Sequence, residues 1–294
     1  MLRPFATASV LALIISACAP AGEDEKLPPA EEAAVGEAAG AAPQPAAEAP
    51  ADFQLSYRLV SENYEVSLEI DPAILAFDPP LAWRLWTDAR TELDAFGASA
   101  DADRKTADAD AAAGGDNWFR GYTLDINHTS TLVLEDVISV SDSLGTYTGG
   151  AHPNYVLAGS VYRKGEGVPL GLSAFIADPP AFNDLVVRGL VDEKMARGYG
   201  PSMRGAVEAE IREYLAPSLE VPDIYAGRFV LEPSTEAGKV GGITVLFSPY
   251  DVGSYAEGAY TVTLPAANIA PVLTEAWAGR FGGEPVAPEG SEAP

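Results

Sequence analysis

Cysteine is almost absent from the sequence, which contains 294 residues and one thiol, Cys18. A single cysteine excludes an internal disulfide and a zinc site built on thiolates. Histidine is also scarce: His128 and His152 are the two present, so a mononuclear zinc site would need carboxylate ligands as well. We therefore expect neither a bound metal nor a cofactor.

The sequence also lacks the common catalytic motifs. It contains no Gly-x-Ser-x-Gly elbow, no His-Glu-x-x-His helix and no phosphate-binding glycine loop. A serine mechanism needs a histidine base that a carboxylate orients, and two histidines leave little choice for that role. The catalytic residues, if there are any, stay unknown at this level.

Basic residues are few compared with acidic ones. There are 18 Lys and Arg against 43 Asp and Glu, which gives a formal net charge of −25. Nucleic acid and anionic lipid headgroups would repel such a chain, whereas a cationic protein would be attracted to it. The acidity also has a simpler interpretation, which is solubility alone. With 47% hydrophobic residues the chain has enough apolar surface for a packed core.

The N-terminal residues have the pattern of an export signal. The apolar run from Ala8 to Ile15 is too short to span a membrane. It ends in Ile15-Ser16-Ala17-Cys18, which resembles a bacterial lipobox, where the cysteine becomes acylated. We predict a lipoprotein signal peptide over residues 1–18 and a lipid anchor in the membrane through Cys18. Ala19 is not the Asp of inner-membrane retention, which favours the outer membrane facing the periplasm. An ordinary signal peptide cleaved elsewhere is the alternative.

Two segments are too poor in bulky residues to fold. Residues 19–51 consist largely of Ala, Pro, Glu and Gly, and residues 283–294 are similar. Such segments bury too little apolar surface to offset the loss of chain entropy. We predict an acidic tether at the front and a disordered tail at the end.

The first folded residues alternate in polarity. Residues 53–59 and 64–70 place apolar side chains at every second position, which predicts a β-hairpin. Asp78 followed by Pro79 then predicts a helix start, with an apolar stripe that continues to Phe96. Residues 97–116 are rich in Ala and Asp, and we interpret their Asp-x-Asp pairs as a solvated insertion rather than a calcium site.

The rest of the chain continues as strands and helices. Strands are predicted over residues 118–127 and 131–140, joined by a turn that His128 caps. Further helices start at Asp178 and Ser202, and a last helix carries Ile269, Leu273 and Trp277. Three more strands are predicted over residues 228–232, 242–247 and 258–264.

This order of elements predicts the fold class. Strands follow one another in hairpins and helices come between groups of strands, which indicates an α+β fold. We expect antiparallel or mixed sheets with helices packed on one side. The elements form two sequential subdomains, over residues 52–163 and 164–282.

One glycine-rich corner stands out as a candidate binding edge. In Tyr147-Thr148-Gly149-Gly150-Ala151-His152-Pro153-Asn154-Tyr155 the glycines permit φ > 0, and the proline holds His152 extended. Tyrosines give stiff contact area with a hydroxyl group, and a second loop, Pro249 to Tyr255, offers more of them. A well-built turn with tyrosines in the core is the alternative. The candidate binding residues are Tyr147, Gly149, Gly150, His152, Asn154, Tyr250 and Tyr255.

Both motifs resemble a known family. Tyr147 to His152, followed about a hundred residues later by Gly242 to Gly258, is similar to the paired extracellular domains of RsiV-type anti-sigma factors. The same pair accompanies PdaC-type peptidoglycan deacetylases. The resemblance covers about residues 53–280, with a PdaC-like first half and an RsiV-like second half. It implies an envelope location and, for the anti-sigma member, recognition of lysozyme. The deacetylase's catalytic domain has no counterpart in this sequence.

Three functions stay open on the sequence. The first is a binding module for peptidoglycan or a lysozyme-like protein, without catalysis of its own. The second is a hydrolase of cell-wall sugars in which His152 acts as general base beside Asp251. The third is a passive envelope scaffold.

Overall fold

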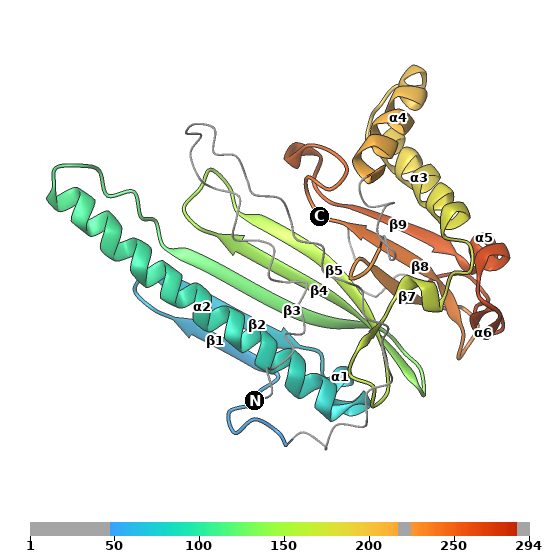
Figure 1. Ribbon diagram of the computed structural model, residues 1–294, viewed down its shortest axis with the longest axis horizontal. Coiled ribbons are helices and arrows are strands. Elements are labelled where there is room, and N and C mark those ends of the chain that lie inside the picture. Colours follow the sequence, from blue (N-terminus) through green and yellow to red (C-terminus); the bar gives the residue numbers. More distant parts are fainter. Residues whose placement is uncertain (1–47, 217–224, 287–294) are drawn as a thin grey trace, which may run out of the picture. The chain divides into compact units, whose positions relative to one another are not determined.

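Two β-sheets and the helices that flank them make up the described part of the computed structural model, residues 48–216 and 225–286 (Figure 1). The first sheet has the order β1-β2-β3-β4-β5-β6, in which β2 and β3 run parallel and the other neighbours antiparallel. The second sheet is antiparallel, with the order β7-β8-β9. The α+β prediction is thereby confirmed.

The strands are β1 (Ser56–Val60), β2 (Tyr64–Ile70), β3 (Tyr122–Val133), β4 (Val137–Tyr147), β5 (Asn154–Arg163), β6 (Pro169–Leu170), β7 (Phe229–Pro233), β8 (Val240–Phe247) and β9 (Tyr260–Pro265). The helices are α1 (Pro72–Phe77), α2 (Pro79–Ala112), α3 (Pro179–Ala196), α4 (Arg204–Leu215), α5 (Ala266–Ile269) and α6 (Glu275–Ala278).

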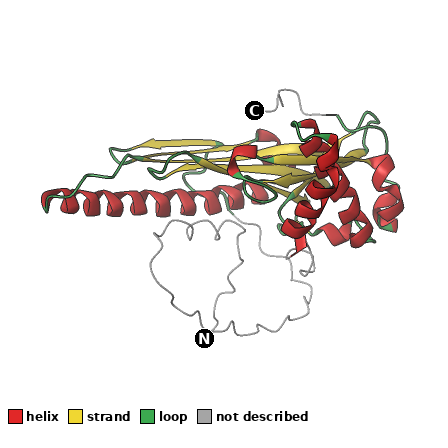
Figure 2. Ribbon diagram, turned by 90° about the horizontal axis from the view of Figure 1, so that it is seen from above, coloured by secondary structure: helices red, strands yellow, loops and turns green. Residues whose placement is uncertain are grey.

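The predicted first hairpin is present as β1 and β2. In β2 the alternate residues Val66, Leu68 and Ile70 are buried, as the polarity pattern indicates. They face α2, which runs along one face of the strands (Figure 2). Asp78 precedes this helix with Pro79 at its first position. Its carboxylate does not cap the helix, because Oδ2 accepts a hydrogen bond from the Gly165 amide at 2.8 Å.

Helix α2 is longer than the sequence suggested. The segment that we interpreted as a solvated insertion, from residue 97, continues the helix to Ala112. Alanine has the highest helix propensity, so the chain stays helical where its bulky stripe ends. Ala100 and Ala107 are buried against Phe119 and Tyr122, which gives this extension a small core of its own.

Strand β3 passes straight through the predicted turn at residues 127–130. Polar side chains suggested a turn there, but those of Asn127, His128 and Ser130 have partners elsewhere in the fold. His128 Nδ1 lies 2.6 Å from Asp142 Oδ1, and the Ser130 amide donates to Asp71 Oδ2 at 3.1 Å. The strand only bulges beyond Ser130. His128 therefore sits in mid-strand and does not cap a turn.

In the second half of the chain, one of the two predicted helix starts is confirmed. Asp178 caps α3 as predicted, accepting from the Ala181 amide at 3.1 Å. Helix α4 begins at Arg204, after a short 3-10 turn at residues 201–203, and not at a Ser202 cap. The predicted last helix is broken into α5, a 3-10 turn at residues 270–272, and α6.

The C-terminal tail starts later than predicted. The Thr235 amide donates to the Glu284 carbonyl at 2.9 Å, and Ser234 and Pro285 form an isolated β-bridge. Residues 283–286 therefore pack beside β7. Residues 287–294 lie outside the described part of the chain.

The two sheets meet through polar contacts and a shared core. Leu231 in β7 donates its amide to Ser139 Oγ in β4 at 2.9 Å, and its carbonyl accepts from Thr131 Oγ1 in β3 at the same distance. Gly159 in β5 donates to the Gly227 carbonyl at 2.9 Å. One hydrophobic cluster includes residues of both halves, from Leu132 to Phe281. The two predicted subdomains thus hold one sheet each, except that β6, beyond residue 164, belongs to the first sheet.

The predicted anchor falls outside the described residues. Cys18, the signal peptide and most of the tether belong to residues 1–47. Within residues 48–216 and 225–286, no helix has both the length and the apolar character needed to cross a membrane.

Candidate functional site

The glycine corner forms the turn between β4 and β5. Tyr147 is the last residue of β4, and Asn154 is the first residue of β5. Gly149 adopts φ +86°, a backbone conformation that favours glycine. His152 is exposed at the tip, whereas Tyr147 and Asn154 are half-buried at the base. The hairpin therefore presents the imidazole to solvent on a short, fixed turn.

The second tyrosine loop reaches this corner. The rings of His152 and Tyr255 stack with their centroids 3.8 Å apart and their planes at 18°. Tyr255 Oη donates a hydrogen bond to the carbonyl of Pro153. The Ala259 amide donates to Tyr155 Oη at 3.1 Å, which ties the end of the loop to β5. Two motifs about a hundred residues apart in sequence thus form one surface, which we call the aromatic corner: His152, Tyr250 and Tyr255.

Tyr250 completes the aromatic corner in an unusual conformation. Its ring centroid lies 5.5 Å from that of Tyr255, and 57% of its surface is exposed. Its φ is +75°, and no other non-glycine residue in the described part of the chain has a positive φ. A tyrosine in this region is strained by about 1–3 kcal/mol, and such strain gathers at functional sites.

Hydrogen bonds fix the loop below its tyrosines. Ser248 Oγ accepts from the Leu157 amide of β5 at 3.0 Å, and the Ser248 amide donates to Asp251 Oδ2 at 2.7 Å. Arg228 Nη1 lies 3.2 Å from the same carboxylate oxygen. Burial raises the pKa of Asp251, although Arg228 and the Ser248 amide oppose the shift. The aromatic corner therefore rests on a rigid support.

His152 and Asp251 have different hydrogen-bond partners. His152 Nδ1 lies 2.9 Å from the Pro153 carbonyl, and because a carbonyl only accepts, Nδ1 carries the proton. Asp251 instead uses its carboxylate on Ser248 and Arg228. A general base oriented by Asp251 needs a hydrogen bond between the imidazole and that carboxylate. The contacts of His152 and Asp251 are made with other groups instead.

A buried ion pair behind the aromatic corner was not recognised from the sequence. Lys194 of α3 is fully buried, and its Nζ lies 3.0 Å from Glu257 Oε2. Glu257 follows Tyr255 by two residues and also accepts from the Ser254 amide at 2.8 Å and from Tyr260 Oη at 2.8 Å. Burial raises the pKa of Glu257, but these hydrogen bonds and Lys194 outweigh it and lower the pKa to about 2.

Two sequence signals could have indicated this pair. Ser254 and Glu257 have the Ser-x-x-Glu spacing of a capping box, which the structure forms. Lys194 follows Leu190 by four residues, so it continues the buried stripe of α3, where a charge needs a partner. Neither signal says which acid meets which base, because that depends on how α3 packs on the loop.

A second buried pair joins β3 and β4. His128 is 8% exposed, its Nδ1 bonds to Asp142, and its Nε2 is buried without a hydrogen-bond partner among the described residues. The pair sits within the first sheet. It is therefore separate in sequence and in strand position from the aromatic corner.

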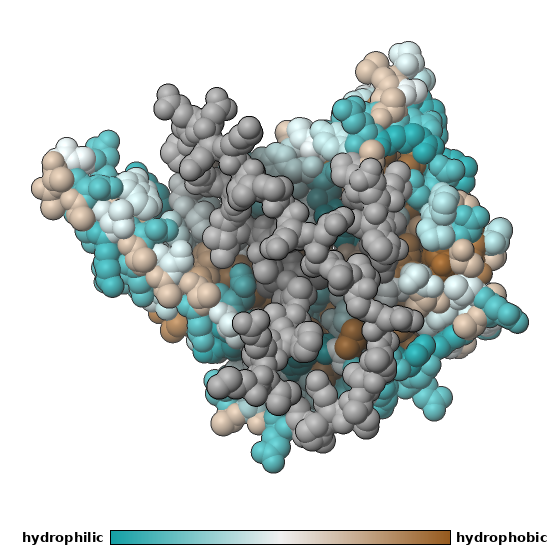
Figure 3. Space-filling model, in the orientation of Figure 1, coloured by the Kyte–Doolittle hydropathy of each residue, from teal (hydrophilic) through white to brown (hydrophobic). Residues whose placement is uncertain are grey.

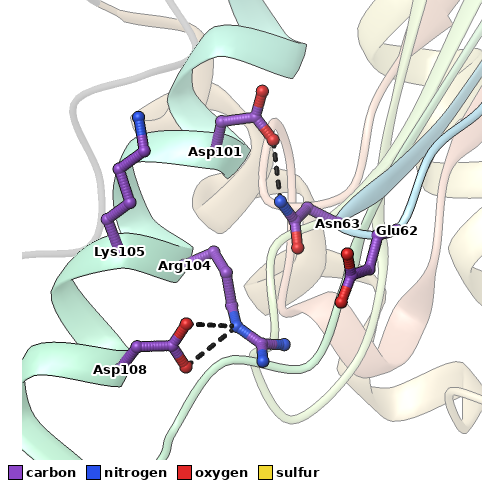
Figure 4. Close-up of a pocket in the computed structure, with 6 residues that line it drawn as sticks. All are labelled: Glu62, Asn63, Asp101, Arg104, Lys105 and Asp108. Atoms are coloured by element: carbon purple, nitrogen blue, oxygen red, sulfur yellow. Dashed lines mark hydrogen bonds and ion pairs between the residues drawn. The ribbon is translucent and has the colours of Figure 1, made fainter.

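A shallow polar pocket of about 400 Å³ lies where the turn between β1 and β2 meets α2 (Figure 4). Asn63 Nδ2 donates to Asp101 Oδ1 at 2.8 Å, and Arg104 Nε donates to Asp108 at 3.0 Å. The acids of the Asp-x-Asp pairs thus bond to neighbouring side chains. The remaining lining residues are Glu62 and Lys105.

Comparison with known proteins gives structural neighbours only. No family model matches the sequence, and no curated protein is similar to it. A DUF3298 family member from Bacteroides fragilis is similar with a TM-score of 0.46 and 17% identity, over 76% of this chain and 95% of its own. A DUF3298 family protein from Pseudomonas aeruginosa has a TM-score of 0.46 and 13% identity, over 80% of this chain and 99% of its own. The chain is thus similar to structures of DUF3298 family proteins.

Proposed function

We propose that this protein is an envelope lipoprotein whose folded part binds a cell-wall component or a lysozyme-like protein, without catalysis of its own. The proposal extends the RsiV-like and PdaC-like resemblance of the two motifs to function. In this proposal Cys18 holds the chain in the outer membrane facing the periplasm, and residues 19–51 separate the binding part from the bilayer.

One observation carries the proposal: the two resembling motifs meet, with His152 stacked on Tyr255 at 3.8 Å. A turn that only reverses the chain does not need a partner loop from the other half of the protein. Tyrosine and histidine rings on rigid backbone lose little conformational entropy when a ligand covers them. The exposed Tyr250 adds an anchor of the kind that dominates binding energy at interfaces.

The binding site is tested by titrating the purified protein with lysozyme and, separately, with soluble peptidoglycan fragments. Tyr250→Ala should weaken binding of the true ligand about tenfold or more, because truncating a central aromatic residue removes about 2 kcal/mol. His152→Ala should weaken it as well. Isothermal titration calorimetry gives the affinities.

The matched control is Tyr214→Ala, which removes a tyrosine of α4 that is 44% exposed and outside the aromatic corner. It should leave the affinity unchanged. Equal losses in the Tyr214 and Tyr250 variants, or no binding of either ligand by the native protein, would contradict the proposed site.

The anchor is tested separately by Cys18→Ala. Without its thiol the chain has no residue to acylate, since the sequence holds no other cysteine. The variant should leave the membrane pellet after cell fractionation and lose incorporation of labelled palmitate. Retention of the label in the variant would refute lipidation at this position.

A further inference from the structure

Strand β9 leaves one edge of the second sheet unpaired among the described strands. The Leu246 amide of β8 donates to the Arg228 carbonyl, beside β7. Because successive residues of an antiparallel strand turn their backbone groups to opposite sides, Val245 and Ile243 turn theirs toward β9. Their register partners Val262 and Leu264 pair with β8. Thr261 and Thr263 therefore direct their N–H and C=O groups away from the sheet.

A groove of about 360 Å³ runs between this edge and α3. The helix approaches the strand closely at Gly189, where an added Cβ would lie 2.3 Å from Val262 Cγ1. Further along, Arg197 Nη2 donates to the Ala259 carbonyl at 2.8 Å. Residue 189 thus lies beside residue 262 and residue 197 beside residue 259, so α3 and β9 run antiparallel. The helix forms one wall of the groove, and the strand edge forms the other.

The two ends of the groove differ in chemistry. Leu185 and Leu264 line it toward the end of β9, whereas Asp192 and Glu193 line it toward Thr261. The Asp192 carboxylate is paired with Arg204 at 2.7 Å. The exposed Arg188 also lines the groove, between Leu185 and Asp192 in sequence, so the cationic preference is confined to the far end, where the exposed Glu193 and the formal charge of −25 favour a basic side chain.

We infer that this groove binds an extended peptide of another chain, which adds to β9 as a strand. Its backbone would pair with Thr261 and Thr263, because unpaired N–H and C=O groups on a strand edge are complemented by another strand. Running antiparallel to β9, it places an apolar side chain beside Leu185 and a basic residue near its C-terminal end beside Glu193. This inference is independent of the aromatic corner and of the function proposed for it.

The test uses the blocked peptide Val-Thr-Val-Thr-Lys, whose valines and lysine lie on one face of an extended strand, with the purified full-length protein. Hydrogen exchange followed by mass spectrometry should show added protection of the fragment that contains residues 260–264. A peptide N-methylated at alternate amides loses two donors and should bind about tenfold more weakly. Glu193→Gln should also weaken binding, and less so at high salt.

Two variants at one position separate backbone pairing from side-chain contact. Thr261→Pro removes the outward amide and should therefore bind the peptide more weakly than the native protein does. Edge strands tolerate proline, so the variant is expected to fold. Thr261→Ala keeps the amide and should bind the peptide as the native protein does. Any of three results would overturn the inference: equal binding by the N-methylated peptide, protection elsewhere than residues 260–264, or a protein dimer that uses this edge. If the proline variant does not fold, the N-methylated peptide decides the question.

Discussion

Glu257 is one of the residues that hold the loop of the aromatic corner, and it links this loop to α3. It joins buried Lys194 to the turn that carries Tyr255, through the Ser254 amide and the Tyr260 hydroxyl. Taking a lysine out of water is unfavourable unless an acid compensates its charge. The ion pair therefore fixes the loop against α3.

Stability should depend on pH through this residue. The pKa of Glu257 in the folded protein is about 2, below its ordinary value near 4.5. A depressed pKa means that the stabilisation is complete above about pH 4.5 and is lost as the pH falls through 2. The free energy of unfolding of the native protein should exceed that of Glu257→Gln by a constant amount above about pH 5, and the difference should shrink toward pH 2.

Urea unfolding at a series of pH values measures this difference. Glu210→Gln is the control, because Glu210 lies 3.8 Å from the same Lys194 Nζ but is exposed. Its effect should be small at every pH, as for other exposed ion pairs. A native-to-Glu257→Gln difference that stays constant down to pH 2 would show that the ion pair does not stabilise the loop.

At the scale of elements, the junction between β5 and β7 needs a glycine. A Cβ on Gly159 would lie 2.5 Å from the Phe229 carbonyl oxygen, which is backbone and cannot turn aside. We expect Gly159→Ala to lower the free energy of unfolding by about 1–3 kcal/mol, as overpacking commonly does. Gly145→Ala in β4 is the control, since its added Cβ meets nothing within 4 Å. Urea unfolding curves compare the two, and equal effects would contradict a tight junction.

Sequence patterns predicted elements well where local chemistry decided them. Alternation placed β2, and Asp178 with its prolines placed the start of α3. The patterns were misleading where distant partners decided. His128 and Ser130 form part of a strand because Asp142 and Asp71 satisfy their side chains, and no local pattern reports a residue so far along the chain. The same limit applies to the site: its rings were predicted, but the Lys194 support was not.

At the scale of the whole molecule, charge sets how a partner arrives. The formal charge is −25, and hydrophilic residues cover much of the visible surface around α2 and α4 (Figure 3). The two carboxylates of the loop that carries Tyr250 and Tyr255 are already paired, Asp251 with Arg228 and Glu257 with Lys194. The acidic excess should therefore steer a cationic partner toward the protein without forming the short contacts at the corner.

For the proposed binding of a lysozyme-like protein, this separation predicts the effect of salt. Exposed charges are screened over about 8 Å at physiological ionic strength and about 3 Å at 1 M. The association rate should fall steeply with added salt, while the dissociation rate, set by short contacts, changes little. Surface plasmon resonance across a salt series measures both rates.

Tyr250→Ala should show the opposite pattern, with faster dissociation and unchanged association, because it removes a contact and no charge. If salt changed mainly the dissociation rate, then paired charges at the corner, and not the surrounding acidic surface, would hold the partner.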